Sequence, residues 1–559
     1  MVNARLKSCL AVLALAALVL SAAAALRGAE YDEQYTLFLT GGVARPAWPA
    51  APFAAGEVSA MQAGHAGLGA IARDLRVTDV HPPLYFWAVA LWRRLIGGGL
   101  LAARLFSVLC GLAALAAVAA IARLTGVPPA LAMLLTLGCY GFAYTGAIAR
   151  GFALAQALTL WGVAVLLASE GRRGRALVGG MLLGAATFAN YLAVFVLLTS
   201  PALRAGFTSP TGAGEVETRS DEGEGDRVGT RHDRIGTRLG GEPGYEGRAC
   251  RPDHPHPRRK GASTSPALAG EVSFLLADLW FFVAQRGSRT SQFPPFHFFD
   301  ALQRLARYAA ATLFGGLPLY VSPPAQPVAA AAVATLALAT VALVAVRWRH
   351  VARAPAARRS LAAAAAAPPI GLLVLGLVFH NTPIELRYLA FSTPFAALLL
   401  AGALASLPRL PRRAAIVLLL TVQAAALAGL MTRPETMQPA RATAAAVAHI
   451  AQGGLVLLPR GNDGVGIVGA FAIESPPTQR LLVIDPDETP GEILVRIGEA
   501  RRVVLALLAQ DDASRATLPA MRAAVSGPCW RRIADGFNVA AFDRICEGDA
   551  AWHSSADSR

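Results

Sequence analysis

Charge-poor apolar segments of about 20 residues recur along this chain, and they restrict its possible folds more than any other feature. A helix that crosses the hydrocarbon core of a bilayer needs roughly 20 consecutive apolar residues. The chain has 559 residues, 55% of them hydrophobic, and a mean hydropathy of +0.46, which excludes an ordinary soluble protein. We therefore predict an all-α, polytopic membrane domain. Its segments lie near residues 9–26, 101–122, 128–148, 151–169, 176–203, 274–286, 327–346, 361–379, 388–407 and 414–431.

Basic residues indicate which ends of these segments face the cytoplasm. The formal net charge is +15, and arginines gather in short stretches between apolar runs, as after residue 169 and at 347–353. This is the positive-inside pattern and not a basic face for nucleic acid. With the N-terminus inside, Arg150 and the 380–388 segment are expected outside. A cleaved signal peptide is the alternative for 9–26, and a retained anchor is favoured because the run is longer than a usual signal core.

The loop after the first apolar run has an unusual concentration of acidic residues. Asp and Glu number only 36 in the chain, yet Glu30, Asp32 and Glu33 fall within four positions. Charges at a membrane edge are often functional, and a solvated turn is the alternative. Further on, Asp79-Val-His-Pro-Pro-Leu-Tyr85 opens an aromatic stretch at about 82–97. The two prolines suit the first turn of a helix, and the aromatic residues suit a helix lying flat in the membrane interface.

These two motifs together resemble the first periplasmic loop of polyprenyl-phosphate-sugar glycosyltransferases, which have the GT-C fold. That family includes dolichyl-phosphate-mannose protein mannosyltransferases, aminoarabinose transferases of lipid A and galacturonosyl transferases of the lipopolysaccharide core. The resemblance implies about 10–12 transmembrane helices, two flat interfacial helices in the first loop and a catalytic Asp at the position of Asp32. It is strong over residues 27–203, diluted over 274–431 and faint beyond.

The resemblance, with the expected topology, assigns candidate roles to ten residues. Asp32 and Glu33 are expected at the catalytic centre. Three of these residues have an alternative role. Arg387 is alternatively an interfacial anchor, Glu385 forms a salt bridge with Arg387, and His81 caps the flat helix. The candidates for substrate binding are Asp79, His81, Tyr85, Arg150, Arg289, Glu385, Arg387 and Tyr388.

A lipid-linked sugar phosphate needs a base for the acceptor hydroxyl and positive charge for the departing phosphate. Asp32 is expected to take the hydroxyl proton, or to orient the acceptor, as its oxygen attacks the anomeric carbon opposite the phosphate and inverts the configuration. Arg387 would hold the phosphate with its planar fork, and Arg150 is the second candidate. Arg304 and Arg307, on an amphipathic stretch, face either this phosphate or solvent.

The expected partners and location follow from this chemistry. The donor is a polyprenyl-phosphate-linked sugar, the acceptor is a glycan, a lipid or a protein, and the site faces the periplasm from the bacterial inner membrane. No cofactor, nucleotide or nucleic acid is expected, and a divalent metal at Asp79 and His81 is an open alternative. A lipid-carrier flippase or transporter and a non-catalytic membrane scaffold are the rival classes.

An insertion divides the membrane domain into residues 1–203, with the catalytic first loop at 27–99, and residues 273–431. Between them, residues 206–272 are rich in Gly, Arg, Asp, Glu and Pro, and we predict that they are disordered. The ends of this insertion repeat each other, as Thr-Ser-Pro-Thr-Gly-Ala-Gly-Glu-Val and Thr-Ser-Pro-Ala-Leu-Ala-Gly-Glu-Val. Its side of the membrane stays open, because 176–203 is either one long span or two short ones bent at Asn190-Tyr191.

Residues 432–548 have the pattern of a small periplasmic α/β domain, followed by a disordered tail at 549–559. Expected strands lie near 454–458, 480–484, 502–508 and 537–543, and expected helices near 440–451, 491–499 and 514–525. Gly464-Val-Gly-Ile-Val-Gly469 matches a dinucleotide fingerprint, but Pro476-Pro477 would break the helix that such a site requires. Cys529 and Cys546 either form a disulfide or stay as two thiols.

Overall fold

The computed structural model describes residues 2–169, 172–199, 266–285, 293–315, 326–432, 439–450, 453–509 and 511–546, which belong to one compact unit. Most of the expected insertion, the 549–559 tail and Arg289 lie outside the described residues. We predicted disorder over residues 206–272, but α13 (Pro266–Ala284) begins within this range, so the prediction is wrong for the last part of the insertion. Ala-Leu-Ala in the second repeat copy favours a helix, so this part of the membrane domain starts before the expected residue 273.

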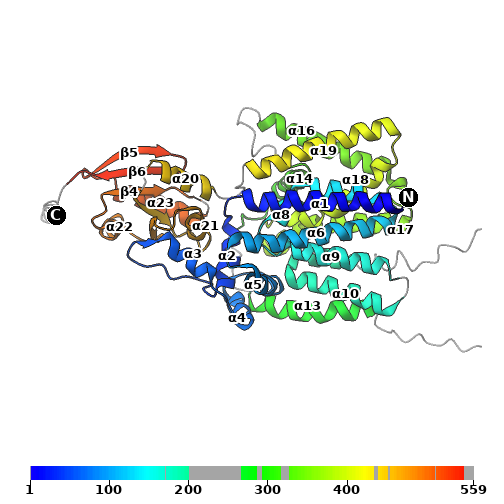
Figure 1. Cartoon of the computed structure of the whole chain (residues 1–559), viewed down its shortest axis with the longest axis horizontal. Helices are drawn as coiled ribbons and strands as arrows, with labels where there is room; N and C mark the ends of the chain where they lie inside the picture. The colour runs from blue at the N-terminus through cyan, green and yellow to red at the C-terminus, as the bar shows by residue number, and fades with distance from the viewer. Residues whose placement is uncertain are drawn as a thin grey trace, which may run out of the picture. The chain divides into compact units, whose positions relative to one another are not determined.

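Apolar helices make this a multi-pass membrane protein (Figure 1). By length and composition, five helices of the described residues can cross a membrane, or six if α7 (Pro129–Gly138) and α8 (Tyr140–Ala147), bent by 72°, form one span. Shorter apolar helices are α9 (Phe152–Leu167), Phe274–Ala284 of α13 and α18 (Thr393–Ala405). The five are Leu6–Leu26 of α1 (Val2–Leu26), α6 (Leu100–Thr125), Pro327–Val346 of α16 (Gln326–Val346), α17 (Pro355–Phe379) and α19 (Arg409–Thr432).

Three expected spans are interrupted. Within the described residues, fewer helices than expected are therefore long and apolar enough to cross a membrane. The 128–148 segment bends at Cys139. The 176–203 segment breaks where α10 (Arg173–Ala189) ends, because the Asn190 side chain accepts a hydrogen bond from the Leu192 N–H and starts a short 3₁₀ turn. That turn, η1 (Tyr191–Ala193), leads into the one-turn helix α11 (Val194–Leu197). The 388–407 segment begins as the 3₁₀ turn η5 (Leu386–Phe391) before α18.

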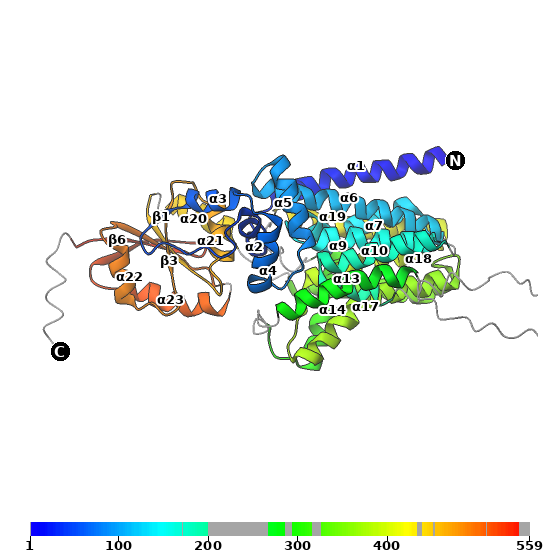
Figure 2. The ribbon, with the colours of Figure 1, turned by 90° about the horizontal axis from the view of Figure 1, so that it is seen from below.

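Close packing joins the helices on both sides of the insertion. In both views α6, α9, α10 and α13 lie side by side (Figures 1 and 2). A Cβ atom on Gly162 of α9 would lie 3.1 Å from the Gly179 oxygen of α10, so small residues let these backbones approach.

The first loop folds into four helices, not the two that the resemblance implies. These are α2 (Tyr31–Gly41), α3 (Ala55–Ala63), α4 (Leu68–Thr78) and α5 (Leu84–Ile96), the last matching the expected flat helix at 82–97. Arg93 of α5 is 1% exposed and donates hydrogen bonds to the carbonyl oxygens of Leu37, Gln62 and Gly98. One buried guanidinium thus ties three segments of the loop together.

The C-terminal region is an α/β domain with strand order β1-β3-β2-β4-β6-β5. Strands β2 (Leu455–Pro459), β3 (Arg480–Ile484) and β4 (Arg502–Ala506) are parallel, while β5 (Trp530–Gly536) and β6 (Val539–Arg544) are antiparallel neighbours at one edge. The other edge is β1 (Phe53–Ala54), which the first loop contributes. The helices of the domain are α20 (Ala440–Ile450), α21 (Gly466–Glu474), α22 (Pro490–Ile497) and α23 (Asp512–Ala524).

The expected strands and helices of this domain are present, with three additions. β1 and β5 are not expected from the sequence, and α21 forms before Pro476 because it ends at Glu474. The glycines of the fingerprint have a packing role: a Cβ atom on Gly466 would collide with the Tyr31 ring, and one on Gly469 would lie 2.8 Å from Phe38. They let α21 lie directly against α2.

The cysteines of the C-terminal domain are paired. Cys529 and Cys546 form a disulfide, with their Cα atoms 4.9 Å apart, which decides between the two alternatives. Cys9, Cys110 and Cys139 are buried free thiols in apolar helices and at the α7–α8 bend.

Candidate functional site

Asp32 and Arg387 meet although 355 positions separate them in the sequence. Asp32 is the second residue of α2, and Arg387 is the second residue of η5. Their side chains form an ion pair, and Arg387 Nη2 also lies 2.5 Å from Glu385 Oε2. The Asp32 side chain is 14% exposed and that of Arg387 is 10% exposed. The predicted base and the predicted phosphate ligand therefore lie together in a largely buried position.

Glu385 and Arg304 extend this charged cluster. Burial raises the pKa of Glu385 to about 7, and the positive charge of Arg304 opposes the rise. Arg304 belongs to α14 (Phe298–Phe314), so one of the two arginines of the amphipathic stretch acts on the same site. A carboxyl group with this pKa is divided between its neutral and charged forms near neutral pH.

Asp79, His81 and Arg150 form a second cluster. Asp79 caps the C-terminus of α4, and its Oδ1 lies 2.8 Å from Nδ1 of His81. Arg150, between α8 and α9, lies 3.6 Å from Asp79 and 3.3 Å from His81. Its guanidinium also lies 5.6 Å from the centre of the Tyr35 ring in α2. One buried carboxylate therefore orients both an imidazole and a guanidinium.

Aromatic side chains connect the two clusters. Phe152, two residues after Arg150, has its ring centre 6.2 Å from that of Tyr388, which directly follows Arg387. Tyr388 is half-buried. Both clusters therefore border one region between the first loop, the start of α9 and η5.

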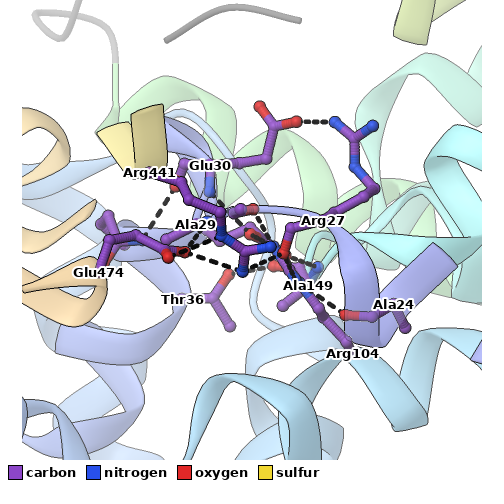
Figure 3. A network of polar contacts seen from close by, with 12 residues as sticks. Ala24, Arg27, Ala29, Glu30, Thr36, Arg104, Ala149, Arg441 and Glu474 are labelled. Carbon is purple, nitrogen blue, oxygen red and sulfur yellow. Dashed lines mark hydrogen bonds and ion pairs between the residues drawn. The ribbon is translucent and has the colours of Figure 1, made fainter. Parts of the chain in front are cut away.

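Glu33 anchors α2 through contacts with Arg104 and Ala149, both of which are labelled in Figure 3. It is fully buried, and its Oε1 and Oε2 atoms lie 2.7 and 2.5 Å from Nε and Nη2 of Arg104. Oε1 also accepts a hydrogen bond from the Ala149 N–H at 2.7 Å, and the Ala149 oxygen accepts one from Thr36 at 2.8 Å. Glu33 thus fixes both the helix that carries Asp32 and the turn that carries Arg150. A side chain occupied in this way has a positioning role, in that it holds the segments that carry Asp32 and Arg150.

A second set of contacts fastens the C-terminal domain to the start of the first loop (Figure 3). Arg441 of α20 pairs with Glu474 of α21 at 2.8 Å and donates to the oxygens of Leu26 and Arg27 at 2.6 and 3.1 Å. Glu474 also accepts a hydrogen bond from the Ala29 N–H at 2.6 Å. The chain between α1 and α2 is therefore held by the C-terminal domain.

Of the remaining predicted residues, Tyr85 packs among aromatic side chains. Tyr85 is fully buried, with its ring 5.4 Å from that of Phe86 and 6.1 Å from that of Phe106, which leaves it no surface for a substrate in this conformation. Arg289 lies outside the described residues.

Sequence reasoning missed the groups that hold the site together. Arg104 lies within an apolar run, and an ionisable residue inside a membrane segment is a signal that could have identified it. Arg27 and Glu30 form a buried ion pair beside it, and burial raises the pKa of Glu30 while Arg27 opposes the rise. Arg441 and Glu474 carry no sequence signal of this kind, because they lie outside the apolar runs and their backbone partners at Leu26, Arg27 and Ala29 are more than 400 positions away.

Among the residues that the structure describes, no group of three or more His, Cys, Asp or Glu side chains could hold a metal ion.

No family model matches the sequence, and no curated protein matches it. Two crystal structures of ArnT from Cupriavidus metallidurans match 95% of this chain and 97% of their own, at 12% identity. The TM-score is 0.46 for the structure bound to undecaprenyl phosphate and 0.48 for the apo state. A cryo-EM structure of a mutant arabinofuranosyltransferase AftD from Mycobacteria matches 97% of this chain and 42% of that chain, at 14% identity and a TM-score of 0.42. The chain is similar to these proteins in structure, over nearly its whole length.

Proposed function

We propose that this protein is an integral membrane glycosyltransferase that moves a sugar from a polyprenyl-phosphate carrier to an envelope acceptor. The observation that carries the proposal is the largely buried ion pair of Asp32 and Arg387. Glycosyl transfer from a lipid phosphate requires a proton acceptor and a ligand for the departing phosphate. The first loop supplies one of these groups and η5, the turn before α18, supplies the other. The resemblance of the first-loop motifs supports the same assignment.

Asp32 acts as the general base in this mechanism. It takes the proton of the acceptor hydroxyl as the acceptor oxygen bonds to the anomeric carbon. The bond from that carbon to the phosphate oxygen breaks in the same step, its electron pair stays on the phosphate, and the configuration inverts. A carboxylate is an effective base when it is held within hydrogen-bond reach of the hydroxyl, and the anchoring of α2 by Glu33 provides this rigidity.

Arg387 stabilises the charge that develops on the phosphate. Its planar guanidinium can bind two phosphate oxygens at once. Because the phosphate and Asp32 compete for this one guanidinium, donor binding releases Asp32 for the acceptor. Arg150 and Arg304 are the neighbouring positive groups that can share the phosphate charge.

Asp79 and His81 have a supporting role in substrate binding. Their mutual contact at 2.8 Å fixes the imidazole beside Arg150, where it can hydrogen-bond to hydroxyl groups of the donor or the acceptor. The half-buried Tyr388 ring offers an apolar surface beside Arg387.

We place the site on the periplasmic face of the bacterial inner membrane. The arginine clusters after α9 and at 347–353 favour the cytoplasm for the opposite ends of the helices. Lipid A, the lipopolysaccharide core, another envelope glycan and protein Ser or Thr all fit as acceptors. The transferred sugar is a hexose or a pentose.

Transfer of a labelled sugar tests the proposal. Purified protein in lipid nanodiscs receives polyprenyl-phosphate sugar labelled in the sugar, together with candidate acceptors from bacterial envelopes. The wild type should transfer the label, and Asp32→Asn should transfer it at least about 100-fold more slowly, because loss of a positioned base removes roughly this factor. Asp512→Asn, at an exposed carboxylate of the C-terminal domain, is the matched control.

The same experiment separates the rival classes. Transfer that survives Asp32→Asn would remove Asp32 from the mechanism. Movement of the carrier across a vesicle membrane without transfer would support a flippase, and neither activity would support a scaffold.

A further inference from the structure

A cavity of about 540 Å³, lined by both polar and apolar residues, lies at one end of the C-terminal sheet. It is formed by the loops that follow β2 and β3, by the start of α23 and by residues 45–47 of the first loop. This volume is within the range of small-molecule binding sites, roughly 300–1,000 Å³. The lining side chains that can hydrogen-bond to a ligand include Arg45, Arg460, Asn462, Asp485 and Asp487.

The position of the cavity in the sheet favours ligand binding. Strand β2 lies between β3 and β4 and is parallel to both. The chain therefore places β3 on one side of β2 and then crosses over to place β4 on the other side. The cavity lies at the carboxyl ends of β2 and β3, next to this switch point, and Ala513 at the start of α23 also lines it. The loop after β4 is joined to the loop after β2, because the Asn462 N–H donates to Asp511 Oδ2 at 3.1 Å. Open α/β sheets bind ligands at this type of point.

The walls of the cavity are fixed by the fold. Trp48 Nε1 donates to the Gly464 oxygen at 2.8 Å, and β1 pairs with β3, so the first-loop wall is attached to the sheet. Asp463 Oδ1 accepts a hydrogen bond from the Val465 N–H at 2.9 Å, which shapes the loop after β2. The Arg460 N–H donates to the Ile484 oxygen at 2.9 Å and joins this loop to the end of β3. A site preorganised in this way loses little entropy when a ligand binds.

The mixture of charges indicates a neutral ligand that is rich in hydroxyl groups. Arg45, Arg460 and Asn462 are hydrogen-bond donors, while Asp485 and Asp487 are acceptors. The adjacent carboxylates oppose a phosphate, and the arginines oppose a cation. A hydroxyl group both donates and accepts, so it can satisfy either kind of side chain. The 2.9 Å pair of Arg460 and Asp485 presents both kinds of group side by side, which suits the neighbouring hydroxyls of a saccharide.

Tyr35 connects the cavity to the candidate transfer site. Asp463, which also lines the cavity, forms a hydrogen bond with the hydroxyl group of Tyr35. The same Tyr35 ring lies against Arg150, and Tyr35 belongs to the helix that carries Asp32.

We infer that this cavity binds saccharide units of the acceptor other than the unit that receives the sugar. The role of this saccharide as the acceptor rests on the proposed function, whereas its binding to the cavity does not. If the inference holds, the acceptor is an oligosaccharide or the glycan part of a glycolipid, long enough to reach both the cavity and Asp32.

Binding to an array of bacterial envelope oligosaccharides tests the inference with the full-length protein in nanodiscs. The wild type and Asp32→Asn should both bind at least one oligosaccharide. Asp487→Asn and Arg45→Ala should each weaken that binding at least tenfold, because both side chains are exposed and removing either leaves the fold intact. The matched controls are Asp535→Asn and Arg532→Ala, an exposed pair on β5 that does not line the cavity, and they should bind like the wild type.

Failure of the cavity assignment and failure of the proposed function give different results. If the wild type binds no oligosaccharide, or if Asp487→Asn binds as well as Asp535→Asn, the cavity is not a saccharide site. Binding that depends on Asp487 in a protein without transfer activity would refute the proposed function alone. Transfer with an unchanged acceptor KM in Asp487→Asn would refute the cavity assignment alone.

Discussion

Replacing Glu33 by Gln should weaken the attachment of the first loop to the membrane helices. Glu33 is fully buried, and both its oxygens are bound by Arg104, whose side chain is 3% exposed. Gln preserves the shape of the side chain but removes its charge, so the guanidinium of Arg104 would stay buried without a counter-ion. The amide group would also point a donor at N–H groups that now have an acceptor, such as that of Ala149.

The expected loss follows from the contacts of Arg104. Removing one partner of a buried ion pair typically costs about 3–5 kcal/mol, because the remaining charge is left uncompensated. Arg104 also donates to the backbone oxygens of Ala24, Arg27 and Gly28 at 2.9, 2.8 and 2.6 Å, and Glu33→Gln leaves these hydrogen bonds in place. We therefore expect a loss near the lower limit, about 3 kcal/mol.

Thermal unfolding of the detergent-purified protein, at one scan rate for all variants, measures this loss. Glu57→Gln is the control, since Glu57 is an exposed carboxylate that accepts a hydrogen bond from the Ala54 N–H at the start of α3. The double variant Glu33→Leu with Arg104→Met should recover only part of the stability, because it removes both charges of this pair but also the hydrogen bonds of Arg104 to the backbone oxygens of Ala24, Arg27 and Gly28. A Glu33→Gln protein as stable as the Glu57→Gln control would refute this reasoning.

Three further predictions concern the rest of the molecule. Cys529→Ser should lower the stability of the C-terminal domain by about 3 kcal/mol in urea unfolding, because its disulfide with Cys546 closes a loop of 17 residues; unchanged unfolding would contradict this. In the wild type the donor KM should rise as the pH increases through about 7, because ionised Glu385 competes with the phosphate for Arg387, and Glu385→Gln should abolish this rise. Because the pKa of Glu385 is raised in the folded protein, its contribution to the stability of the fold is present below pH 4.5 and is lost as the pH rises from 4.5 to about 7. Arg441→Ala should speed amide hydrogen exchange in the segment between α1 and α2, measured by mass spectrometry, and exchange at the wild-type rate would show that the contacts of Arg441 do not hold this segment.

The parts of the fold that could be predicted are those in which burial produces a period or a run in the sequence. All residues of β2 (Leu455–Pro459) are buried, and its apolar run predicted a strand of nearly the same length. Likewise α6 (Leu100–Thr125) was expected from a long run with few charges. In both elements, burial or contact with lipid requires apolar residues, so the apolar run predicts the element without knowledge of the segments that pack against it.

Elements that depend on a distant partner could not be predicted. Strand β1 (Phe53–Ala54) has only two residues and exists because β3 offers it an edge. Helix α21 (Gly466–Glu474) is rich in glycine, and its stability comes from packing against α2, not from helix propensity.

The candidate site could be predicted in part. Topology indicated that Asp32 and Arg387 lie on one side of the membrane, and the first-loop motif singled out Asp32. Their direct contact depends on the 3₁₀ geometry of η5, which no local pattern reveals. The buried pair of Glu33 and Arg104 was missed because a lone arginine in an apolar helix shows its partner only in three dimensions.

Cross-linking of cysteines placed at positions 32 and 387 by a short bifunctional thiol reagent would test the central claim most directly. The double variant Asp32→Cys with Arg387→Cys is made in a chain whose free cysteines are replaced by Ser and is treated in native membranes with a reagent whose spacer is about as long as an arginine side chain. Because the two native side chains form an ion pair, we predict nearly complete cross-linking, and none when Asp32→Cys is combined with Arg412→Cys, beyond the far end of α18. Failure of the 32–387 pair to cross-link in a folded protein would contradict the shared site on which the proposed transfer reaction depends.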